Sequence, residues 1–342
     1  MNRKVRIGLI GCGNYGKNLL RFLDKMDCYD VISIADPDQN AARAGAQLLS
    51  YSTKLYADDT QLIAARDIDA VIIATPNDQH AEQAIRAMEA GLAVYLEKPI
   101  ACTIPDCRRV IAAQRHTGAR VMVGMQLRYG EVFSKAKELL CQGVIGDVKL
   151  LWYREFRGPF FPGADSWRIS NEKSGGTIVE KNVHHLDLFN WYADAAPVAV
   201  FATGGSDAIY KKSGMLDNAI VTVDYDSGAR ACVGLSLFSA GCDRDIDFYI
   251  VGEHGVMYIG EDTITVKPTK VVTYKIEQRF ADMGHGGTEF SALTAFYALV
   301  TRNKVPLTGV YEGLLSVGMA LAAQISAAEH REVKLSEITG AQ

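Results

Sequence analysis

The distribution of apolar residues divides the chain into two parts. Up to Gly124, short apolar runs alternate with segments of helical periodicity. We expect strands at residues 5–10, 31–35, 70–74, 93–96 and 121–123, and helices at 15–26, 40–49, 79–90 and 104–117. Continuous apolar strands separated by helices indicate a parallel sheet that is covered on both faces. The pattern therefore predicts an α/β domain over residues 1–124.

After Gly124 the strands lengthen and alternate between apolar and polar positions. We expect helices at residues 131–141, 176–192, 289–302 and 311–328, and a loop at 157–174. The expected strands are 147–156, 198–208, 219–225, 230–238, 245–251 and 271–276. Period-2 strands separated by Gly-containing turns favour an antiparallel sheet. Residues 125–342 are therefore expected to form a second, α+β domain with a mostly antiparallel sheet.

A glycine-rich turn follows the first expected strand. The spacing G-x-G-x-x-G is met by Gly11, Cys12, Gly13, Asn14, Tyr15 and Gly16. Gly11 permits a tight turn, Gly13 lets a pyrophosphate approach the backbone, and Gly16 lets the helix pack closely on the strand. The N-terminus of the helix then favours a phosphate. The turn predicts a dinucleotide site.

An acid follows the second expected strand. Asp36 lies about 20 residues after Gly16, where the dinucleotide fingerprint places the carboxylate that binds the ribose hydroxyls of NAD. The same carboxylate would repel the 2′-phosphate of NADP, and no arginine follows directly. We therefore expect NAD rather than NADP.

A second motif ends the fifth expected strand. Glu97-Lys98-Pro99 lies at the carboxyl end of the sheet, the edge at which open α/β sheets bind ligands. Pro99 stiffens the backbone that presents Lys98. A lysine beside a bound cofactor can exchange a proton with a substrate hydroxyl. Lys98 is therefore a candidate catalytic residue.

The charge and the cysteine content limit the partners and the cellular compartment that we expect for this protein. The chain has 342 residues, with Lys+Arg 36 against Asp+Glu 40 and a formal net charge of −4. This charge does not favour a nucleic acid or an anionic membrane as partner. No apolar run approaches the ~20 residues that span a bilayer. The N-terminal apolar stretch is short and interrupted by Arg6, so we interpret it as a strand of a cytoplasmic protein, and the seven cysteines as reduced, buried thiols.

Taken together, these motifs resemble the glucose–fructose oxidoreductase/inositol dehydrogenase/MocA (Gfo/Idh/MocA) family. The resemblance rests on the glycine turn, Asp36-Pro37, residues 74–77 and Glu97-Lys98-Pro99, in this order, and continues through Trp167-Arg168 and the helix that carries His184. It implies a Rossmann domain, a second domain with an open-faced sheet, NAD(P), a sugar or polyol substrate, and dimers or tetramers. It also implies that Lys98, often beside a cis Lys–Pro bond, serves the substrate hydroxyl.

The resemblance extends the expected sites. Besides the turn and Asp36, the expected cofactor-binding residues are Thr75, Pro76, Asn77, His80, Glu97, Lys98 and Gln126. The expected substrate-binding residues are Arg128, Trp167, Arg168, His184 and His285. His285 lies in a glycine-flanked segment that is similar to one that approaches substrate in the family.

One face of the expected helix at 176–192 carries proton-transfer chemistry. Glu180, His184 and Asp187 are four and three residues apart, and Trp191 continues the same stripe. His184 can accept a hydroxyl proton while a neighbouring carboxylate orients its ring. We expect Glu180, His184 and Asp187 to act with Lys98. The family commonly has Asp at the position of Glu180, whose longer side chain leaves open whether it contacts substrate or pairs with a cation.

A metal centre is not favoured. His184 and His185 are adjacent, so their side chains diverge by about 100° on a helix, and the spacing H-E-x-x-H is absent. The sequence therefore predicts an NAD-dependent dehydrogenase or reductase that acts on a ring carbon of a cyclic polyol, sugar or sugar derivative. Two alternatives stay open, a glycosidase that works through transient oxidation by bound NAD and a non-catalytic NAD-binding sensor. The convergence of Lys98 and His184 over one nicotinamide is the spatial condition of the first hypothesis.

Overall fold

The computed structural model describes residues 3–159, 166–239, 245–267, 271–278 and 287–340. It contains two compact units. Unit 1 comprises residues 1–126 and 281–314, and unit 2 comprises residues 127–280 and 315–342. The chain first passes from unit 1 to unit 2 after Gln126, two residues beyond the expected boundary at Gly124. Unit 1 also takes residues 281–314, which the sequence pattern assigned to the second domain.

Unit 1 is a parallel six-stranded sheet in the order β3-β2-β1-β4-β5-β6. Its strands are β1 (Val5–Ile10), β2 (Tyr29–Ala35), β3 (Lys54–Tyr56), β4 (Ala70–Ile73), β5 (Ala93–Glu97) and β6 (Val121–Gly124). Its helices are α1 (Asn14–Asp24), α2 (Gln39–Ala46), α3 (Asp59–Ala64), α4 (His80–Glu89), α5 (Ile104–Thr117) and α9 (Thr288–Arg302). All of β4 and β5 is buried, as expected for strands between two helical layers. The predicted parallel sheet is confirmed.

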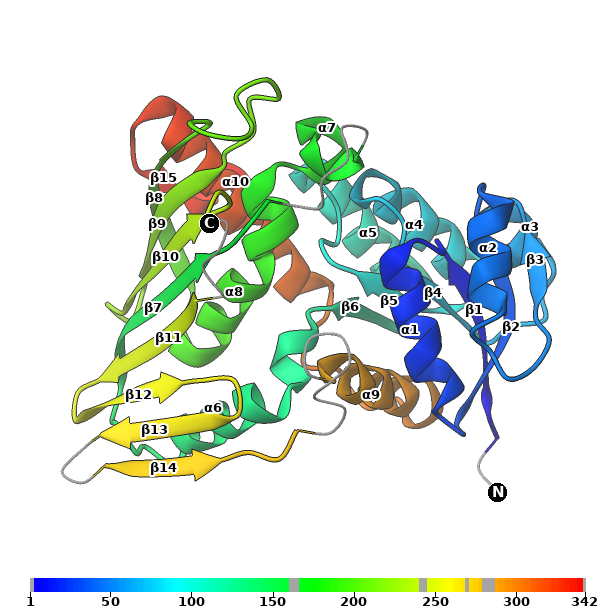
Figure 1. Ribbon diagram of the computed structural model, residues 1–342, viewed down its shortest axis with the longest axis horizontal. Helices are drawn as coiled ribbons and strands as arrows, with labels where there is room; N and C mark the ends of the chain where they lie inside the picture. Colours follow the sequence, from blue (N-terminus) through cyan, green and yellow to red (C-terminus); the bar gives the residue numbers. More distant parts are fainter. Residues whose placement is uncertain (1–2, 160–165, 240–244, 268–270, 279–286, 341–342) are drawn as a thin grey trace. The chain divides into compact units, whose positions relative to one another are not determined.

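Both faces of this sheet are covered by helices (Figure 1). Helix α1 packs against α2 and α9 on one face, and α4 packs against α3 and α5 on the other. Helix α9 is tied to the sheet because Tyr29 donates a hydrogen bond from its hydroxyl to the carbonyl of Leu293 (2.7 Å), and Phe296 packs edge-on against Tyr95. These long-range contacts explain why α9 belongs to unit 1.

Unit 2 is a nine-stranded sheet in the order β14-β13-β12-β11-β7-β10-β9-β8-β15. Every neighbouring pair is antiparallel except β7 and β10. The strands are β7 (Val148–Phe156), β8 (Pro197–Gly205), β9 (Asn218–Tyr225), β10 (Arg230–Ser236), β11 (Asp245–Gly252), β12 (Gly255–Ile259), β13 (Thr263–Lys267), β14 (Val272–Lys275) and β15 (Val333–Lys334). The mostly antiparallel second sheet is therefore also confirmed.

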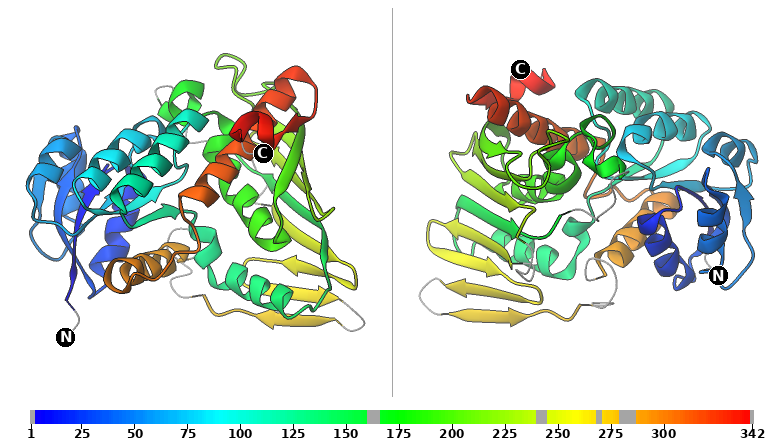
Figure 2. Two further views of the ribbon diagram at one scale, coloured as in Figure 1. Left: turned by 180° about the vertical axis from the view of Figure 1, so that it is seen from behind. Right: turned by 45° about the horizontal axis from the view of Figure 1, so that its top comes forward.

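The helices of unit 2 gather on one face of its sheet (Figure 2). They are α6 (Glu131–Cys141), α7 (Asn171–Ser174), α8 (Thr177–Ala193), α11 (Leu335–Thr339) and most of α10 (Val310–Glu329), whose first turn belongs to unit 1. Along β7, Leu151 and Tyr153 are buried toward this helical side, whereas Leu150 and Trp152 point the other way and are exposed. We call the side that carries Trp152 the outer face.

Apolar side chains line up across the outer face. The strand registers place Phe201, Thr222, Cys232, Trp152 and Tyr249 in one row from β8 to β11. The exposed fractions of Phe201, Trp152 and Tyr249 are 45, 41 and 38%. Large aromatic side chains in one exposed row mark a surface suited to burial against another protein.

The structure adds elements that the pattern did not predict. Strand β3 and helix α3 lie between predicted elements, and β12 and β13 form a hairpin after β11. The predicted loop at 157–174 contains the short turn η3 (Trp167–Ile169) and α7, because the Ser166 and Ser170 side chains cap their N-termini. These elements have three to six residues each, and in most of them polar residues interrupt the apolar runs by which the other elements were predicted.

The structure differs from the sequence analysis in two further respects, the apolar helix α10 and the burial of the cysteines. Among the described helices, α10 is long and apolar enough to cross a membrane by length and composition alone, although the sequence analysis expected no such run. In the fold, 67% of its most apolar stretch is buried. The six described cysteines are free thiols, but only four are buried, and Cys141 is exposed.

Candidate active site

The glycine turn of unit 1 has the geometry of a phosphate site. Gly11 adopts a φ of +89°, and a Cβ there would lie 2.7 Å from the backbone of Ala74. A Cβ on Gly16 would collide with the Gly11 carbonyl oxygen, so the close approach of α1 to the turn requires glycine. A Cβ on Gly13 would meet nothing within 4 Å. This open space, at a helix N-terminus without a side-chain cap, fits a pyrophosphate.

Asp36 lies beside the same turn. Its carboxylate accepts hydrogen bonds from the backbone N–H of Cys12 (2.7 Å) and of Asp38 (2.8 Å). One side chain thus joins the end of β2 to the glycine turn. The carboxylate retains acceptor capacity for ribose hydroxyls, because each oxygen has more than one lone pair.

The second strand-end motif is fixed by a buried histidine. The Lys98–Pro99 peptide bond is cis. The two ring nitrogens of His80 lie 2.7 Å from the carbonyl oxygen of Pro99 and 3.1 Å from that of Thr75. Because His80 is 1% exposed, it holds two of the expected cofactor-lining segments together and presents little surface to a ligand itself. The Thr75 hydroxyl donates to Gln83 (2.6 Å), and Asn77 is buried beside it.

Beneath Lys98 lies a buried polar group. Glu97 is 4% exposed and Glu289, at the start of α9, is 0% exposed. The phenol of Tyr15 lies within hydrogen-bonding reach of Glu97 and accepts a hydrogen bond from the Gln126 amide (3.1 Å). A Cβ on Gly124 would collide with the Glu97 carboxyl group, so this glycine makes room for it. Tyr15, Glu97 and Gln126, all expected at the cofactor, thus lie in this one group. Glu289, which the sequence analysis did not include, acts electrostatically on the same group.

Burial raises the pKa of Glu97 to about 8. The Lys98 ammonium opposes this rise, and the carboxylate of Glu289 adds to it. Burial and the nearby Glu97 likewise raise the pKa of Tyr15. Glu97 is therefore mostly protonated near neutral pH, a carboxylic acid directly beside the candidate catalytic lysine.

In unit 2, the predicted stripe lies on α8 and its carboxylates have cationic partners. The guanidinium Nε of Arg168 donates to Glu180 Oε1 (3.0 Å), and the same guanidinium stacks over the Trp167 ring at 4.3 Å. Glu180 is 5% exposed and His184 is 9% exposed. Glu180 thus pairs with a cation, the second of the two roles that its extra length left open.

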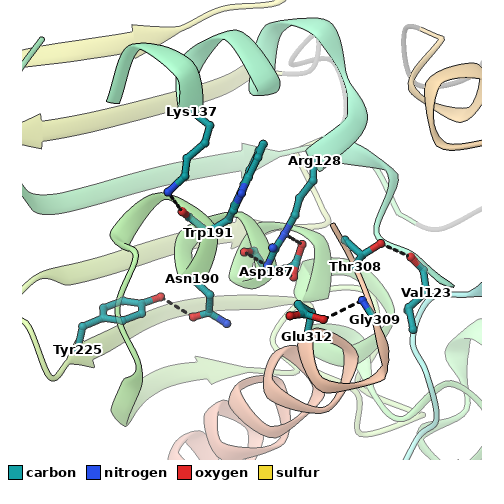
Figure 3. A network of polar contacts seen from close by, with 10 residues as sticks. All are labelled: Val123, Arg128, Lys137, Asp187, Asn190, Trp191, Tyr225, Thr308, Gly309 and Glu312. Atoms are coloured by element: carbon teal, nitrogen blue, oxygen red, sulfur yellow. Dashed lines mark hydrogen bonds and ion pairs between the residues drawn. The ribbon is translucent and has the colours of Figure 1, made fainter. Parts of the chain in front are cut away.

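Asp187 is engaged more completely (Figure 3). Arg128 Nε donates to Asp187 Oδ2 (2.7 Å) and Arg128 Nη2 donates to Oδ1 (2.6 Å). The side chains of Arg128 and Asp187 are 8 and 1% exposed, and the guanidinium lies 5.6 Å from the Trp191 ring. A carboxylate held in this way is suited to orienting neighbouring groups rather than to moving a proton.

A further ion pair borders the stripe. Lys181 Nζ lies 2.9 Å from Glu155 Oε1, and His185 stacks on Tyr153 at 3.8 Å between ring centroids. Burial raises the pKa of Glu155, but Lys181 and His185 outweigh it, so that the net pKa is lowered. The sequence analysis did not include Glu155, because it lies on β7 and its partner Lys181 lies on α8. The position of Lys181 next to Glu180 was the one signal that an ion pair could form there.

Within each unit, contacts join some of the expected residues. In unit 1, Asp36 contacts the glycine turn, Tyr15 contacts Glu97 and Gln126, and His80 contacts Thr75 and Pro99; in unit 2, Arg168 contacts Glu180 and Arg128 contacts Asp187. His285 lies outside the described residues. The described part of the chain holds no group of three or more His, Cys, Asp or Glu side chains that could bind a metal. The convergence of Lys98 and His184, which belong to different units, stays a prediction.

Comparison with known proteins adds to this geometry. Residues 5–125 match the model of an oxidoreductase family with an NAD-binding Rossmann fold, GFO_IDH_MocA, and residues 137–335 match the C-terminal alpha/beta domain of that family. An uncharacterised oxidoreductase from Streptococcus pneumoniae is 33% identical over 60% of this chain, an alignment that spans only 54% of that protein.

Two other relatives align over nearly the whole chain. Myo-inositol 2-dehydrogenase from Thermotoga maritima is 26% identical over 98% of this chain and all of that protein. The crystal structure of myo-inositol 2-dehydrogenase from Lactobacillus plantarum superposes with a TM-score of 0.84 at 24% identity, covering 97% of this chain and 99% of that one. At this identity the structural likeness concerns the fold.

Proposed function

The chain belongs to the Gfo/Idh/MocA oxidoreductase family, and on that premise we propose that it transfers a hydride between nicotinamide and a ring carbon of a cyclic polyol, sugar or sugar derivative. The observation that carries the proposal is the arrangement in unit 1, where Lys98 follows the end of β5 at the same edge of the parallel sheet as the glycine turn and Asp36. The inositol dehydrogenases among its relatives support the substrate class.

Each unit contributes part of the proposed chemistry. NAD, when bound, supplies the hydride acceptor. Its phosphates would be held at Gly13 and the N-terminus of α1, and its ribose by Asp36. Lys98 and His184 would manage the proton of the reacting hydroxyl, because amine and imidazole groups can both accept and return a proton. Glu180 and Asp187 would orient these groups as ionised carboxylates.

Replacement of the lysine tests this assignment. We expect Lys98→Met to retain NAD binding but to lower turnover by a factor on the order of 10² or more, since proton transfer loses its acceptor. NADH formation would be followed over inositols, aldoses and their derivatives. Lys173→Met, an exposed lysine on α7, is the matched control. Near-wild-type turnover of Lys98→Met would remove Lys98 from the mechanism. Sugar release without net NADH would favour the glycosidase alternative, and binding without turnover the sensor.

The cofactor preference is tested separately. Because the carboxylate of Asp36 would repel a 2′-phosphate, we expect Asp36→Ala to weaken NAD more than NADP. Fluorescence titration of both reduced cofactors would measure the ratio of their dissociation constants. An unchanged ratio would contradict the role of Asp36.

We also propose that the protein works in the cytoplasm as a homo-oligomer whose contact is the outer face of unit 2. The free thiols of the described cysteines support the compartment. The row of Phe201, Trp152 and Tyr249 supports the contact, since a second copy would cover it. Trp152→Glu should lower the molar mass measured by light scattering. The control is Lys149→Glu, which changes an exposed residue on the same strand. Trp191→Glu would not serve as the control, because Trp191 contacts Arg128. An unchanged mass would exclude this contact.

A further inference from the structure

A cavity lies in unit 1, at the opposite end of the sheet from the proposed cofactor site. It has a volume of about 990 Å³. Its wall includes the start of β1 at Val5, the residues that precede β4, β5 and β6, and the last turn of α9. Because all six strands are parallel, their starting ends share one edge, and the glycine turn and Lys98 lie at the other edge. The cavity is therefore separate from the proposed active site.

The rim of this cavity is basic. Five cationic side chains line it, against the two carboxylates of Asp69 and Glu89; the cations are Arg3, Lys4, Arg66, Arg120 and Arg302. Arg3 pairs with Asp69 (2.7 Å), and Lys4 pairs with Asp30 outside the cavity (2.9 Å). Counting the lining side chains, five positive charges less two negative ones leave an excess of three. An anion would be attracted to this rim.

Part of this charge serves the fold. Helices α3, α4 and α9 all end at the cavity, and their C-terminal carbonyl groups carry partial negative charge. Arg120 donates a hydrogen bond to the carbonyl of Val300 (2.7 Å) in the last turn of α9. By contrast, no ion pair joins Arg66 or Arg302 to a carboxylate among the described residues. These two guanidinium groups remain for a ligand.

The backbone at Arg66 is an independent observation. Arg66 follows α3 with a φ of +53°, in the left-handed region that favours glycine. A residue with a Cβ costs about 1 kcal/mol there, and a glycine would close the helix without that cost. An arginine thus occupies a strained position at the end of α3, where its side chain lines the cavity. Strained backbone is common at ligand sites.

Apolar side chains contribute the smaller part of the cavity lining. Ile68 and Leu92 are 5 and 8% exposed, and Ile63 and Val300 join them in the lining. The ring of Tyr297 also lines the cavity, and its hydroxyl donates to the carbonyl of Arg3 (3.4 Å). A ligand that fits this wall and the rim has an apolar or planar body and a charged end.

We propose that this cavity binds an organic phosphate monoester, with its phosphate between Arg66 and Arg302 and its apolar or planar body against Tyr297 and Ile68. Guanidinium groups suit a phosphate dianion because each offers two parallel N–H donors. Inorganic phosphate alone would leave the apolar wall uncovered, and a neutral aromatic compound would leave the arginines unused. Both parts of the ligand therefore contribute to its affinity.

Calorimetric titration of the full chain with phenyl phosphate, phenol and inorganic phosphate tests the proposal. The titrations are made with and without saturating NADH, so that binding at the proposed cofactor site is recognised by competition. We expect phenyl phosphate to bind with a Kd on the order of 10⁻⁴ to 10⁻³ M at low salt, more tightly than either of its parts, unaffected by NADH and weakened by salt. Competition with NADH, or no saturable heat, would overturn the proposal while leaving the dehydrogenase assignment intact.

Two variants locate the site. Arg66→Gly relieves the backbone strain, so we expect an unchanged or higher Tm together with an affinity for phenyl phosphate that is at least fivefold weaker. Arg302→Gln should weaken the affinity by a similar factor. Arg43→Gln, an exposed arginine on α2 that bonds to Asn40, is the matched control and should change nothing. Unchanged affinity in both Arg66→Gly and Arg302→Gln would refute this location. A loss of affinity in a variant of equal or higher Tm cannot be attributed to misfolding.

Discussion

The two units hold their buried carboxyl groups in different ways. On α8, Glu180 and Asp187 each have an arginine partner, Arg168 and Arg128, within 3.0 Å. In unit 1, Glu97 lies among a phenol, an adjacent lysine and a second buried carboxylate, and burial raises its pKa to about 8. A guanidinium stabilises the ionised form of a carboxylate, whereas burial near a like charge stabilises the neutral form.

This difference separates two tasks of the proposed site. The carboxylates of α8 keep a constant charge and geometry, which suits the orientation of His184 between them. Glu97 can change its charge near neutral pH, because burial raises its pKa to about 8 while the adjacent Lys98 opposes that rise. A change of carboxyl charge is thus expected at the strand end of unit 1, whereas the two paired carboxylates of α8 hold their charge beside His184.

Among the substitutions on α8, we expect Asp187→Asn to have the largest effect on stability, because it removes the charge that pairs with Arg128. Arg128 would keep its charge while its nearly buried guanidinium loses the opposite charge. We expect the free energy of unfolding to fall by about 3–5 kcal/mol, measured by urea denaturation. The double variant Arg128→Met/Asp187→Leu should recover much of the loss, since it removes both charges.

The control is an exposed pair in the same unit. Arg230 and Asp224 are 70 and 54% exposed, so Asp224→Asn should change the free energy of unfolding by less than about 1 kcal/mol. If Asp187→Asn cost no more than Asp224→Asn, the Arg128–Asp187 pair would not be the rigid element that the comparison requires.

Local patterns predicted the parts of the site that lie on single elements. The glycine turn could be identified because its three glycines meet three steric needs within six residues, and the α8 stripe because helical periodicity brings residues 180, 184 and 187 onto one face. The turn, α5 and α6 were predicted close to their observed bounds for the same reason.

Partners on other elements could not be predicted in this way. Arg128 lies 59 residues from Asp187, Glu155 contacts Lys181 from β7, and Glu289 reaches the environment of Glu97 from α9. Periodicity describes which face a side chain occupies, not which distant segment covers that face. The same reason explains why residues 281–314 were assigned to the second domain, although α9 packs against α1 and β1.

Glu97→Gln should sharpen the unit 1 side through the pH dependence of stability. Because the pKa of Glu97 is raised from 4.5 to about 8 on folding, the folded state binds more protons than the unfolded chain between these values. The stability of the wild type therefore falls as pH rises from about 4.5 to 8, and the glutamine variant lacks this dependence. At pH 8.5 we expect Glu97→Gln to be more stable than the wild type by up to about 4.5 kcal/mol, because the wild type must ionise a group whose pKa is raised by folding.

Urea denaturation at pH 5 and 8.5 would measure this difference, with Glu82→Gln as the control because Glu82 is half exposed. Parallel pH profiles of the wild type and Glu97→Gln would show that Glu97 ionises normally. Glu97 would then resemble the carboxylates of α8, and the contrast between the two units would disappear.

The smallest expected effect concerns the Glu180–Arg168 pair, which is more exposed than the Arg128–Asp187 pair. The side chain of Glu180 is 6% exposed but that of Arg168 is 31% exposed, so solvent screens this pair more than the Arg128–Asp187 pair. A double-mutant cycle of Glu180→Gln and Arg168→Met should give a coupling free energy of about 0.5–1 kcal/mol. Increasing salt should lower that coupling, while the coupling between Arg128 and Asp187 should change little, because burial shields that pair from ions. If the Glu180–Arg168 coupling were as large and as independent of salt as the Arg128–Asp187 coupling, the greater exposure of Arg168 would not weaken its pair, and both carboxylates would be held equally firmly.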